Sequence, residues 1–331
     1  MTWFEELVGF PETSPSVVHE NLVVDDNLLA SRANGREFAC GHLETLSLDE
    51  LRRRLKAVNP GNDAILVREE IADVQALHRE ESNTGALFQV ASQFNLLEMA
   101  SPGVTPEQGV GIYESDFTQG PACAIAAGAG TIYRNYFVPV NGRTGQSEDN
   151  QIDCLRDLGH ALGNEDNRLW KMRNGYAMAS RTGLLDISDR LRDADEDERD
   201  ELRQLLRVGM QWETQVTLRG SRHRVSQAYC SALPVAYAPH PAELWEDFAR
   251  LVLEAAYEAT LIIAVLNAAR TGNNRVYLTL LGGGAFGNEV AWITDSIERA
   301  LRRYRNWGLD VAIVSYGRSK PPVRELVTRF T

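Results

Sequence analysis

The feature that most constrains the fold is an alternation of strand-like and helix-like segments that begins at Asp63. Short apolar runs typical of strands are AILV, GALFQVAS, TIYRNYFVPV, VSQAYC, RVYLTLL and LDVAIVSYG. Between them lie helical patterns, among them REEIADVQALH, GPACAIAAGAG and a long segment from Ala242 to Ala269. Because strands that alternate with helices pair into parallel or mixed sheets covered by those helices, the sequence predicts an α/β fold with a mixed sheet.

Two segments interrupt this alternation. Near the N-terminus, NLVVDD and REFACGHL predict a hairpin with Asn34 and Gly35 at its turn, and LSLDELRRRL predicts a short helix after it. Later, DISDRLRDADEDERDELRQLLRV combines leucines with dense charge and predicts a solvent-facing helical hairpin or arm. No internal repeat or low-complexity linker is visible, so we predict one elaborated domain. Its parts are an N-terminal extension (1–60), an α/β core (61–140 and 225–331) and a mainly helical insertion (141–224).

Charge, cysteines and apolar segments limit the kinds of protein this can be. The 331 residues carry a formal net charge of -12, which disfavours a nucleic-acid-binding surface. The four cysteines include no C-x-x-C pair and have no histidine at ligand spacing, so they predict neither a metal site nor a disulfide framework. The longest apolar stretch, ATLIIAVLNAA, is about half a membrane span, and the N-terminus lacks the basic region of a secretory signal. We expect a cytoplasmic protein with no cofactor, no membrane contact and no nucleic-acid partner; its oligomeric state stays open.

A glycine loop, LLGGGAFGN, follows the predicted strand RVYLTLL. Gly282, Gly284 and Gly287 fit the dinucleotide fingerprint, but that fingerprint belongs to the first turn of a repeated βαβ unit whose next strand ends in an acid. Here only one strand follows, and Asp310 begins it. The helix predicted to start near Asn288, a good N-cap residue, still offers free backbone N–H groups and a positive dipole end. The loop therefore predicts a phosphate or diphosphate site, and the alternative is a tight turn whose glycines only allow packing.

A second unusual segment follows the predicted strand in GALFQVAS. Gln93 and Asn95 come at the end of that strand, and Glu114 and Asp116 lie in a polar loop before a small-residue helix that starts near Gly120. Open α/β sheets bind ligands at the carboxyl ends of their strands, so these side chains are candidates for a ligand site. The alternatives are that the two amides only tie down a long loop and that the two acids are solvated loop charge.

The two loops together resemble the macrodomain superfamily, whose members bind ADP-ribose or hydrolyse ADP-ribosyl bonds. FQVASQFN followed by TQGPACAIAAGAG is similar to the family's amide-rich strand end and catalytic loop. VYLTLLGGGAFGN, a helix and LDVAIVSYG are similar to its diphosphate loop and last strand. The resemblance covers residues 62–138 and 225–317 and is closer to the glycohydrolase members than to the small binding modules. The family's N-A-A-N segment and four-glycine run are absent from this chain, and the insertion has no counterpart in the family.

The resemblance implies roles for particular residues. It makes Asp116, with Glu114 as the other candidate, the acid near the distal ribose, which Asn95 would orient. It places Gln119 where the family has an acid, so that the general base would be missing. It implies that Asp73 holds the adenine amino group. The remaining residues of the implied ligand site are Gln93, Gly282, Gly283, Gly284, Ala285, Phe286, Gly287 and Asn288.

These observations leave several functions open. The leading hypothesis is a hydrolase that removes ADP-ribose from a modified protein or a related derivative, through an oxocarbenium-like transition state and an activated water. One alternative, favoured by Gln119, is a module that binds ADP-ribose or an NAD-derived nucleotide without turnover. Another is an interaction protein whose contact surface is the acidic arm from Asp193 to Glu201. Arg134, within the predicted strand TIYRNYF, could line a pocket, although this strand is more typical of a buried core.

Overall fold

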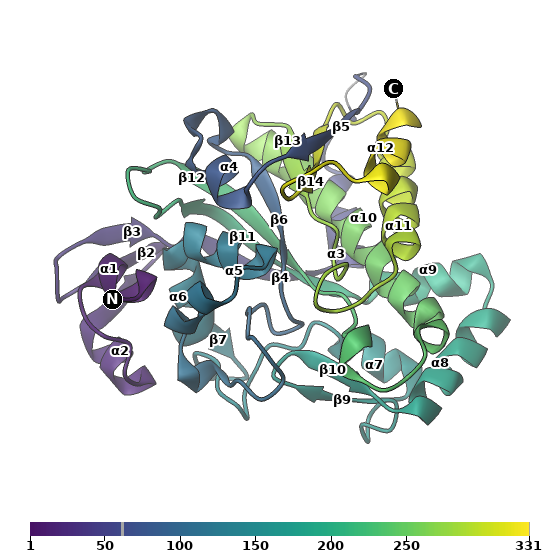
Figure 1. Cartoon of the computed structure of the whole chain (residues 1–331), viewed down its shortest axis with the longest axis horizontal. Helices are drawn as coiled ribbons and strands as arrows, with labels where there is room; N and C mark the ends of the chain where they lie inside the picture. Colours follow the sequence, from purple (N-terminus) through teal and green to yellow (C-terminus); the bar gives the residue numbers. More distant parts are fainter. Residues whose placement is uncertain (61–62, 331) are drawn as a thin grey trace.

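The computed structural model describes residues 1–60 and 63–330. At its centre is a seven-stranded mixed sheet, in which β12, β6, β13, β14 and β5 run parallel and β11 runs antiparallel to both of its neighbours (Figure 1). This arrangement confirms the predicted α/β class. In spatial order the strands are β4 (His42–Ser47), β11 (Arg207–Gln215), β12 (Arg224–Cys230), β6 (Leu87–Ala91), β13 (Arg275–Leu278), β14 (Asp310–Ser315) and β5 (Leu66–Ile71).

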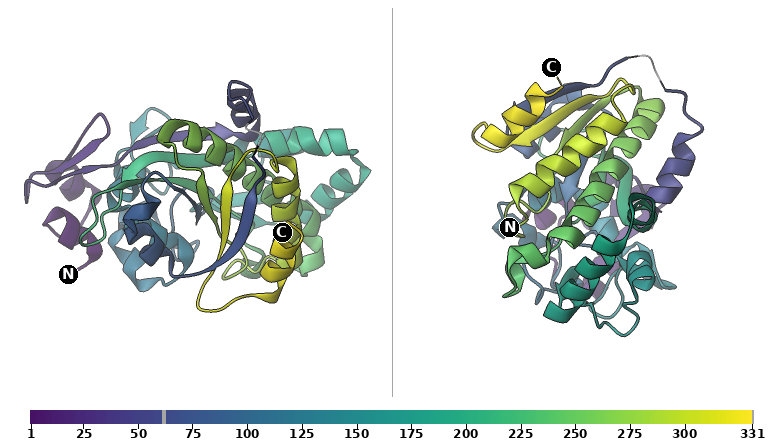
Figure 2. Two further views of the ribbon diagram at one scale, coloured as in Figure 1. Left: turned by 90° about the horizontal axis from the view of Figure 1, so that it is seen from above. Right: turned by 90° about the vertical axis from the view of Figure 1, so that its right-hand side faces the viewer.

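Helices cover both faces of the sheet (Figure 2). One layer contains α3 (Leu48–Leu55), α10 (Glu246–Thr271), α11 (Val290–Arg303) and α12 (Pro321–Thr328). The other contains α4 (Val74–Arg79), α5 (Gln119–Ala126) and α6 (Gly128–Tyr136). The helix α10 is long and apolar enough to cross a membrane, but 83% of its most apolar window is buried inside the protein, so it is the central core helix of this fold.

The N-terminal segment forms a small subassembly beside the main sheet. It consists of α1 (Trp3–Val8), α2 (Pro15–Asn21) and a three-stranded sheet of β1 (Leu22–Asp25), β2 (Leu28–Ser31) and β3 (Glu37–Ala39). The predicted pairing of NLVVDD with REFACGHL is wrong, because an additional strand, β2, lies between them and pairs with both. The chain turns between β1 and β2 at Asp26, which has a φ of 54°. The Asn34–Gly35 turn joins β2 to β3. The β2 run, LLAS, is too short to predict from its pattern.

The segment predicted as an insertion adds further elements. They are β7 (Pro139–Val140), β8 (Arg143–Thr144), α7 (Arg156–Leu162), β9 (Trp170–Arg173), β10 (Tyr176–Ala179), α8 (Arg181–Asp193) and α9 (Glu196–Gln204). Two strands of the main sheet, β4 and β11, also come from segments that the sequence placed outside the α/β core. The predicted boundaries at 61 and 331 lie outside the described residues, and the division into three parts stays a prediction.

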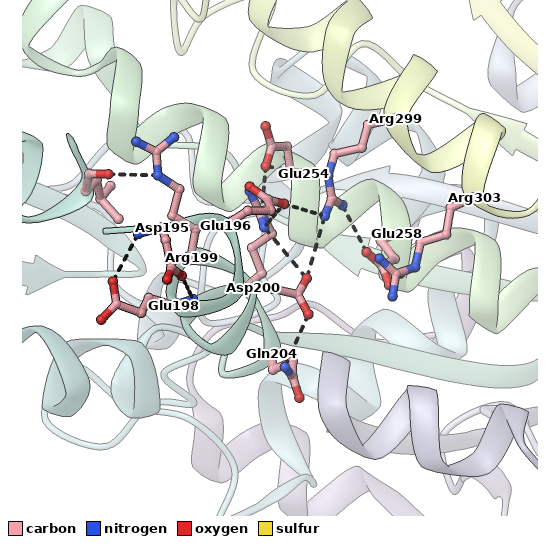
Figure 3. A network of polar contacts seen from close by, with 12 residues as sticks. Asp195, Glu196, Glu198, Arg199, Asp200, Gln204, Glu254, Glu258, Arg299 and Arg303 are labelled. Carbon is pink, nitrogen blue, oxygen red and sulfur yellow. Dashed lines mark hydrogen bonds and ion pairs between the residues drawn. The ribbon is translucent and has the colours of Figure 1, made fainter. Parts of the chain in front are cut away.

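A network of arginines and carboxylates fastens the α8–α9 pair to the core (Figure 3). Arg203 of α9 donates to Glu254 of α10 at 2.6 Å. Arg52 of α3 bridges Asp200 of α9, at 2.5 Å, and the buried Glu258 of α10, at 2.7 Å. The predicted helical hairpin is therefore confirmed, but one of its faces packs against α10, and only the other faces solvent.

Two predicted secondary structures near the candidate site are wrong. The segment TIYRNYF lies in helix α6, not in a strand, because Ile132 and Tyr136, four residues apart, pack on one helical face against the apolar cluster that contains Phe4 and Leu7. The helix predicted in REEIADVQALH begins only at Val74, since the first part of that segment extends strand β5 to Ile71.

Candidate functional site

A cavity of about 160 Å³ lies at the carboxyl ends of β6 and β13. The segment after β6, the N-terminal end of α5 and the glycine loop after β13 form its walls. The two loops that the sequence singled out therefore meet in one place, although almost two hundred residues separate them. Residues from both loops line the cavity, including Gln93, Glu98, Asp116, Gln119, Gly282 and Phe286.

The chain after β6 makes a tight turn that returns it to the cavity. The N–H of Gln93 donates to the carbonyl of Leu97 at 2.9 Å, and the N–H of Leu97 donates to Asn95 Oδ1 at 3.1 Å. Leu96, at the tip, has a φ of 65°, a conformation that non-glycine residues rarely adopt outside functional or strongly held turns. This turn brings Glu98 into the wall of the cavity.

Glu98 is the functional candidate that the sequence analysis missed. Its exposed fraction is 2%, and neither of its carboxyl oxygens has a hydrogen-bond partner within the described chain. Burial raises the pKa of Glu98 to about 8, although Arg134 and Tyr113 lower it in part. The carboxyl group is therefore largely protonated at neutral pH. The only sequence signal was a single acid within the apolar run LLEMA, which a surface loop explains equally well.

The raised pKa of Glu98 has an expected effect on stability. In the unfolded chain the carboxyl group ionises near the ordinary glutamate pKa of 4.5, so between that pH and about 8 the folded state holds a proton that the unfolded state has lost. The contribution of Glu98 to the free energy of unfolding should therefore fall as pH rises through this window, by at most about 1.4 kcal/mol per pH unit. Denaturant unfolding of the wild type and Glu98→Gln from pH 5 to pH 8 measures it. Parallel pH dependences in the two proteins would contradict the shift.

The structure separates the two acids predicted in the loop before α5. Asp116 is half-buried, lines the cavity and accepts a hydrogen bond from the N–H of Thr118 at 2.9 Å. Glu114 is exposed and does not line the cavity. Its carboxylate accepts the N–H of Trp3 at 3.0 Å and thereby holds helix α1 against the loop. The geometry thus leaves Asp116 at the candidate site and gives Glu114 a structural contact.

The predicted amide side chains mainly hold the loops in place. Asn95 is fully buried, lies outside the cavity lining and donates to Gln151 Oε1 at 2.9 Å. Gln93 lines the cavity, but its amide is bonded to the N–H and carbonyl of Met99 at 2.7 and 3.2 Å. Both therefore match the alternative that such amides tie down a long loop.

Gln119 also has a clear structural contact. Its Oε1 accepts the N–H of Ala91 at 2.9 Å, and its Nε2 donates to the carbonyl of Gln89 at 2.8 Å. The side chain thus pairs with β6 as a backbone peptide group would. A carboxylate at this position could not donate the second bond, so the amide explains why an acid is absent here.

The glycine loop lines the cavity and contains backbone N–H groups without a hydrogen-bond partner in the described chain. The loop closes through a hydrogen bond from the N–H of Asn288 to the carbonyl of Gly282 at 2.9 Å. Gly282 has a φ of 71°, and a Cβ there would lie 2.5 Å from the Cβ of Ala232, so only glycine fits. Between Gly282 and Phe286, the N–H groups of Gly282, Gly284, Ala285 and Phe286 donate to no acceptor in the described part of the chain, and these four residues line the cavity.

Two other predicted features of this loop differ from the sequence expectation. Asn288 is not the N-cap of the following helix, because its side chain is buried and donates to the carbonyl of Leu233 at 2.8 Å. An N-cap at Asn288 would start the helix at residue 289, but helix α11 begins at Val290. Glu289 is in the N-cap position, and its side chain makes no capping hydrogen bond. Asn288 therefore fixes the base of the loop, and Gly283 and Gly287 donate their N–H groups within or near it.

Three aromatic rings pack together at one side of the cavity. Tyr176 of β10, Tyr237 and Phe286 have ring centroids 5.2 to 5.6 Å apart, and all three line the cavity. The hydroxyl of Tyr176 donates to the carbonyl of Met99 at 2.6 Å and so links β10 to the turn that carries Glu98. The predicted insertion thus supplies part of the cavity wall through Tyr176. The sequence did not indicate this contact, because Tyr176 is far along the chain from both loops.

Comparison with known proteins gives structural similarities only. No protein-family model and no curated protein matches the sequence. Among solved structures, the chain is similar to a poly(ADP-ribose) glycohydrolase from Thermomonospora curvata, with 12% identity, 96% of each chain covered and a TM-score of 0.47. It is also similar to the poly(ADP-ribose) glycohydrolase from Deinococcus radiodurans in complex with ADP-ribose. There the identity is 11%, 87% of this chain and 93% of that chain are covered, and the TM-score is 0.46.

The remaining predicted residue, Asp73, lies at the same edge of the sheet but outside the cavity. Its Oδ1 caps helix α4 by accepting the N–H groups of Gln75 and Ala76 at 2.9 and 3.0 Å. Its side chain is exposed just beyond the carboxyl end of β5. Beyond the end of β14, the next strand in the sheet, Tyr316 is 76% exposed. This part of the edge therefore offers one acid and one aromatic ring to solvent.

Other features of the structure do not compete with this cavity as a catalytic site. Within residues 1–60 and 63–330 there is no group of three His, Cys, Asp or Glu side chains that could hold a metal ion. A second cavity, of about 400 Å³, lies between α1 and the loop from β11 to β12. Its charged lining residues, Glu6, Arg36 and Arg219, are all exposed, and none of the predicted site residues reaches it.

Proposed function

We propose that this protein is an ADP-ribosyl hydrolase, which binds an ADP-ribose group and cleaves the bond between its distal ribose and an acceptor. The observation that carries the proposal is the position of Glu98. It is a buried carboxyl group with a raised pKa in the wall of the cavity that the glycine loop also lines. A carboxylic acid kept neutral at pH 7 can donate a proton to a leaving group, and the free amides of the loop can bind the negative charge of a diphosphate.

The chemistry follows from these groups. Cleavage of a glycosidic bond passes through an oxocarbenium-like state, and protonation of the leaving atom makes the bond easier to break. Glu98 supplies that proton. Water then adds to the anomeric carbon, and Asp116, on the neighbouring wall, or the diphosphate of the ligand accepts its proton. The sugar and the acceptor leave as separate molecules, with one water consumed.

The size of the cavity indicates how the ligand lies. Sites that enclose a drug-sized ligand have volumes of about 300 to 1,000 Å³. The cavity here, of about 160 Å³, is smaller than that range, which favours a ligand of which only one part lies inside it. We propose that the distal ribose lies beside Glu98 and the diphosphate lies on the glycine loop. The adenine then extends along the sheet edge toward Tyr316, which would stack on it, and Asp73, which would accept from its amino group.

Two measurements on the purified protein test this proposal. Calorimetry should show saturable binding of ADP-ribose, and incubation with mono- or poly-ADP-ribosylated protein should release free ADP-ribose. Absence of binding at millimolar ADP-ribose would exclude the proposal. Binding without any release would instead support the alternative of a non-catalytic ADP-ribose-binding protein.

A further inference from the structure

Arg134 of helix α6 lies directly behind Glu98. The exposed fractions of the two side chains are 0% and 1%, and the Nη2 of Arg134 is 3.5 Å from Glu98 Oε1. The turn that carries Glu98 also contacts the same arginine, because the carbonyl of Leu96 accepts a hydrogen bond from its Nε at 3.0 Å. A guanidinium this deeply buried is costly unless it is paired, so its contacts have to offset that cost.

The guanidinium of Arg134 is held rigidly. Its Nη2 donates to Thr131 Oγ1 at 3.2 Å, and its carbon lies 3.6 Å from the centroid of the Tyr229 ring. The hydroxyl of Tyr229 donates to Gln227 Oε1, and the amide of Gln227 donates to the carbonyl of Cys123 at 2.9 Å. This second layer fixes the ring and, through it, the plane of the guanidinium. The positive charge is therefore preorganised beside the carboxyl group.

The contact between Glu98 and Arg134 is loose. Ion pairs between a guanidinium and a carboxylate usually have N–O distances of about 2.7 to 2.9 Å, shorter than the 3.5 Å found here. Both oxygens of Glu98 and the Nη1 of Arg134 lack hydrogen-bond partners within the described chain. The pair thus has unused hydrogen-bonding capacity, which a newly formed carboxylate would take up.

Other titratable groups around Glu98 do not provide this charge. Tyr113, from the 3₁₀ helix Gly111–Ser115, accepts the N–H of Glu98 at 3.2 Å. Cys123 faces it from α5, and Asp116 lines the same cavity. Tyr229, from β12, completes the surroundings. Among these described groups Arg134 alone is a cation.

We propose that Arg134 is a positioning residue for Glu98, which holds its carboxyl group at the cavity wall and stabilises the carboxylate that remains after proton donation. The inference rests on the proposed function. In the step concerned, the O–H bond of Glu98 breaks, a bond from that proton to the leaving atom forms, and the electron pair of the glycosidic bond goes to the leaving group. Asp116 or the diphosphate takes the proton of the attacking water, and proton exchange with solvent later restores the acid form of Glu98.

Neutral substitutions of Arg134 test the proposal through the pH dependence of ADP-ribose release. Arg134→Gln keeps donors for Leu96, Arg134→Met keeps only an apolar stem, and Arg134→Lys keeps the charge. In the wild type the rate should fall on the alkaline side as Glu98 ionises. In either neutral variant we expect a maximal rate about tenfold lower than in the wild type. The alkaline limb of the pH–rate profile, where the rate falls, should move to a pH higher by about one unit or more. Arg134→Lys should restore the position of the limb.

A merely structural role would lower the rate at every pH and leave the limb in place, and that result would overturn the proposal. Circular dichroism and ADP-ribose binding check that each variant is folded. A carboxyl titration of Glu98 by carbon-13 NMR provides a readout that does not depend on turnover. If the wild type releases no ADP-ribose, the proposed function fails, yet the titration still decides whether Arg134 lowers the pKa of Glu98.

Discussion

Replacing Glu98 with glutamine should lower the rate of ADP-ribose release by a factor of about 10² to 10⁴, the range typical of a general acid. The substitution keeps the shape of the side chain and matches the neutral form that the buried acid has at pH 7, so the fold should be retained. It removes only the transferable proton. Single-turnover release from an ADP-ribosylated protein measures the loss, and calorimetry should show that ADP-ribose still binds with an affinity within a few-fold of the wild type.

Glu114→Gln is the matched control for this experiment. It makes the same chemical change on an exposed glutamate that contacts Trp3 and lies outside the cavity. Its rate should stay within about twofold of the wild type, with at most about 1 kcal/mol lost in stability through the weaker bond to the Trp3 N–H. Equal losses in the two variants, or an active Glu98→Gln protein, would remove Glu98 from the mechanism and return attention to Asp116.

The α/β class and the two loops that line the cavity were predictable because they depend on local patterns. Apolar runs alternate with helical periodicity, and glycines cluster where a strand meets a helix, so each signal can be recognised within a short stretch of the chain. The carboxyl-end rule for open sheets then places both loops at one edge. The pairing of β4 and β11 with the main sheet could not be predicted in this way, because it depends on contacts between segments that local patterns assigned elsewhere.

The side chains of the candidate site were harder to predict, because their chemistry depends on burial. Glu98 and Glu114 look alike in the sequence, and the family resemblance favoured the loop that holds Glu114. Their burial distinguishes them in the structure, and it depends on the turn at Leu96 and on Gly120. Gly120 leaves room for Glu98, because a Cβ on Gly120 would lie 3.1 Å from the Cγ of Glu98. The sequence pattern placed Arg134 on a strand. In the structure it lies on helix α6, which directs its side chain toward Glu98.

The second large effect is expected from a charge placed in the glycine loop. Gly284→Asp should raise the Kd for ADP-ribose by about 100-fold or more, because like charges brought together at a binding site cost several kcal/mol and each 1.4 kcal/mol is about a tenfold change. The fold should tolerate the change, since a Cβ at Gly284 meets no atom within 4 Å and its φ is outside the left-handed region. Gly282 could not be used in this way, because its positive φ and the nearby Ala232 make any side chain disruptive.

The matched control is Gly103→Asp, which adds the same carboxylate to an exposed glycine of ordinary φ whose added Cβ would approach nothing closer than 3.7 Å. Gly103 does not line the cavity, so calorimetry should give it the affinity of the wild type. If Gly284→Asp also binds like the wild type, the amides of the loop do not hold the diphosphate, and the loop is only a tight turn. If it loses binding and gains it back partly at high salt, the effect is electrostatic, because salt screens charges at such exposed positions. That pattern would separate the loss of a diphosphate site from a local distortion, which salt would not repair.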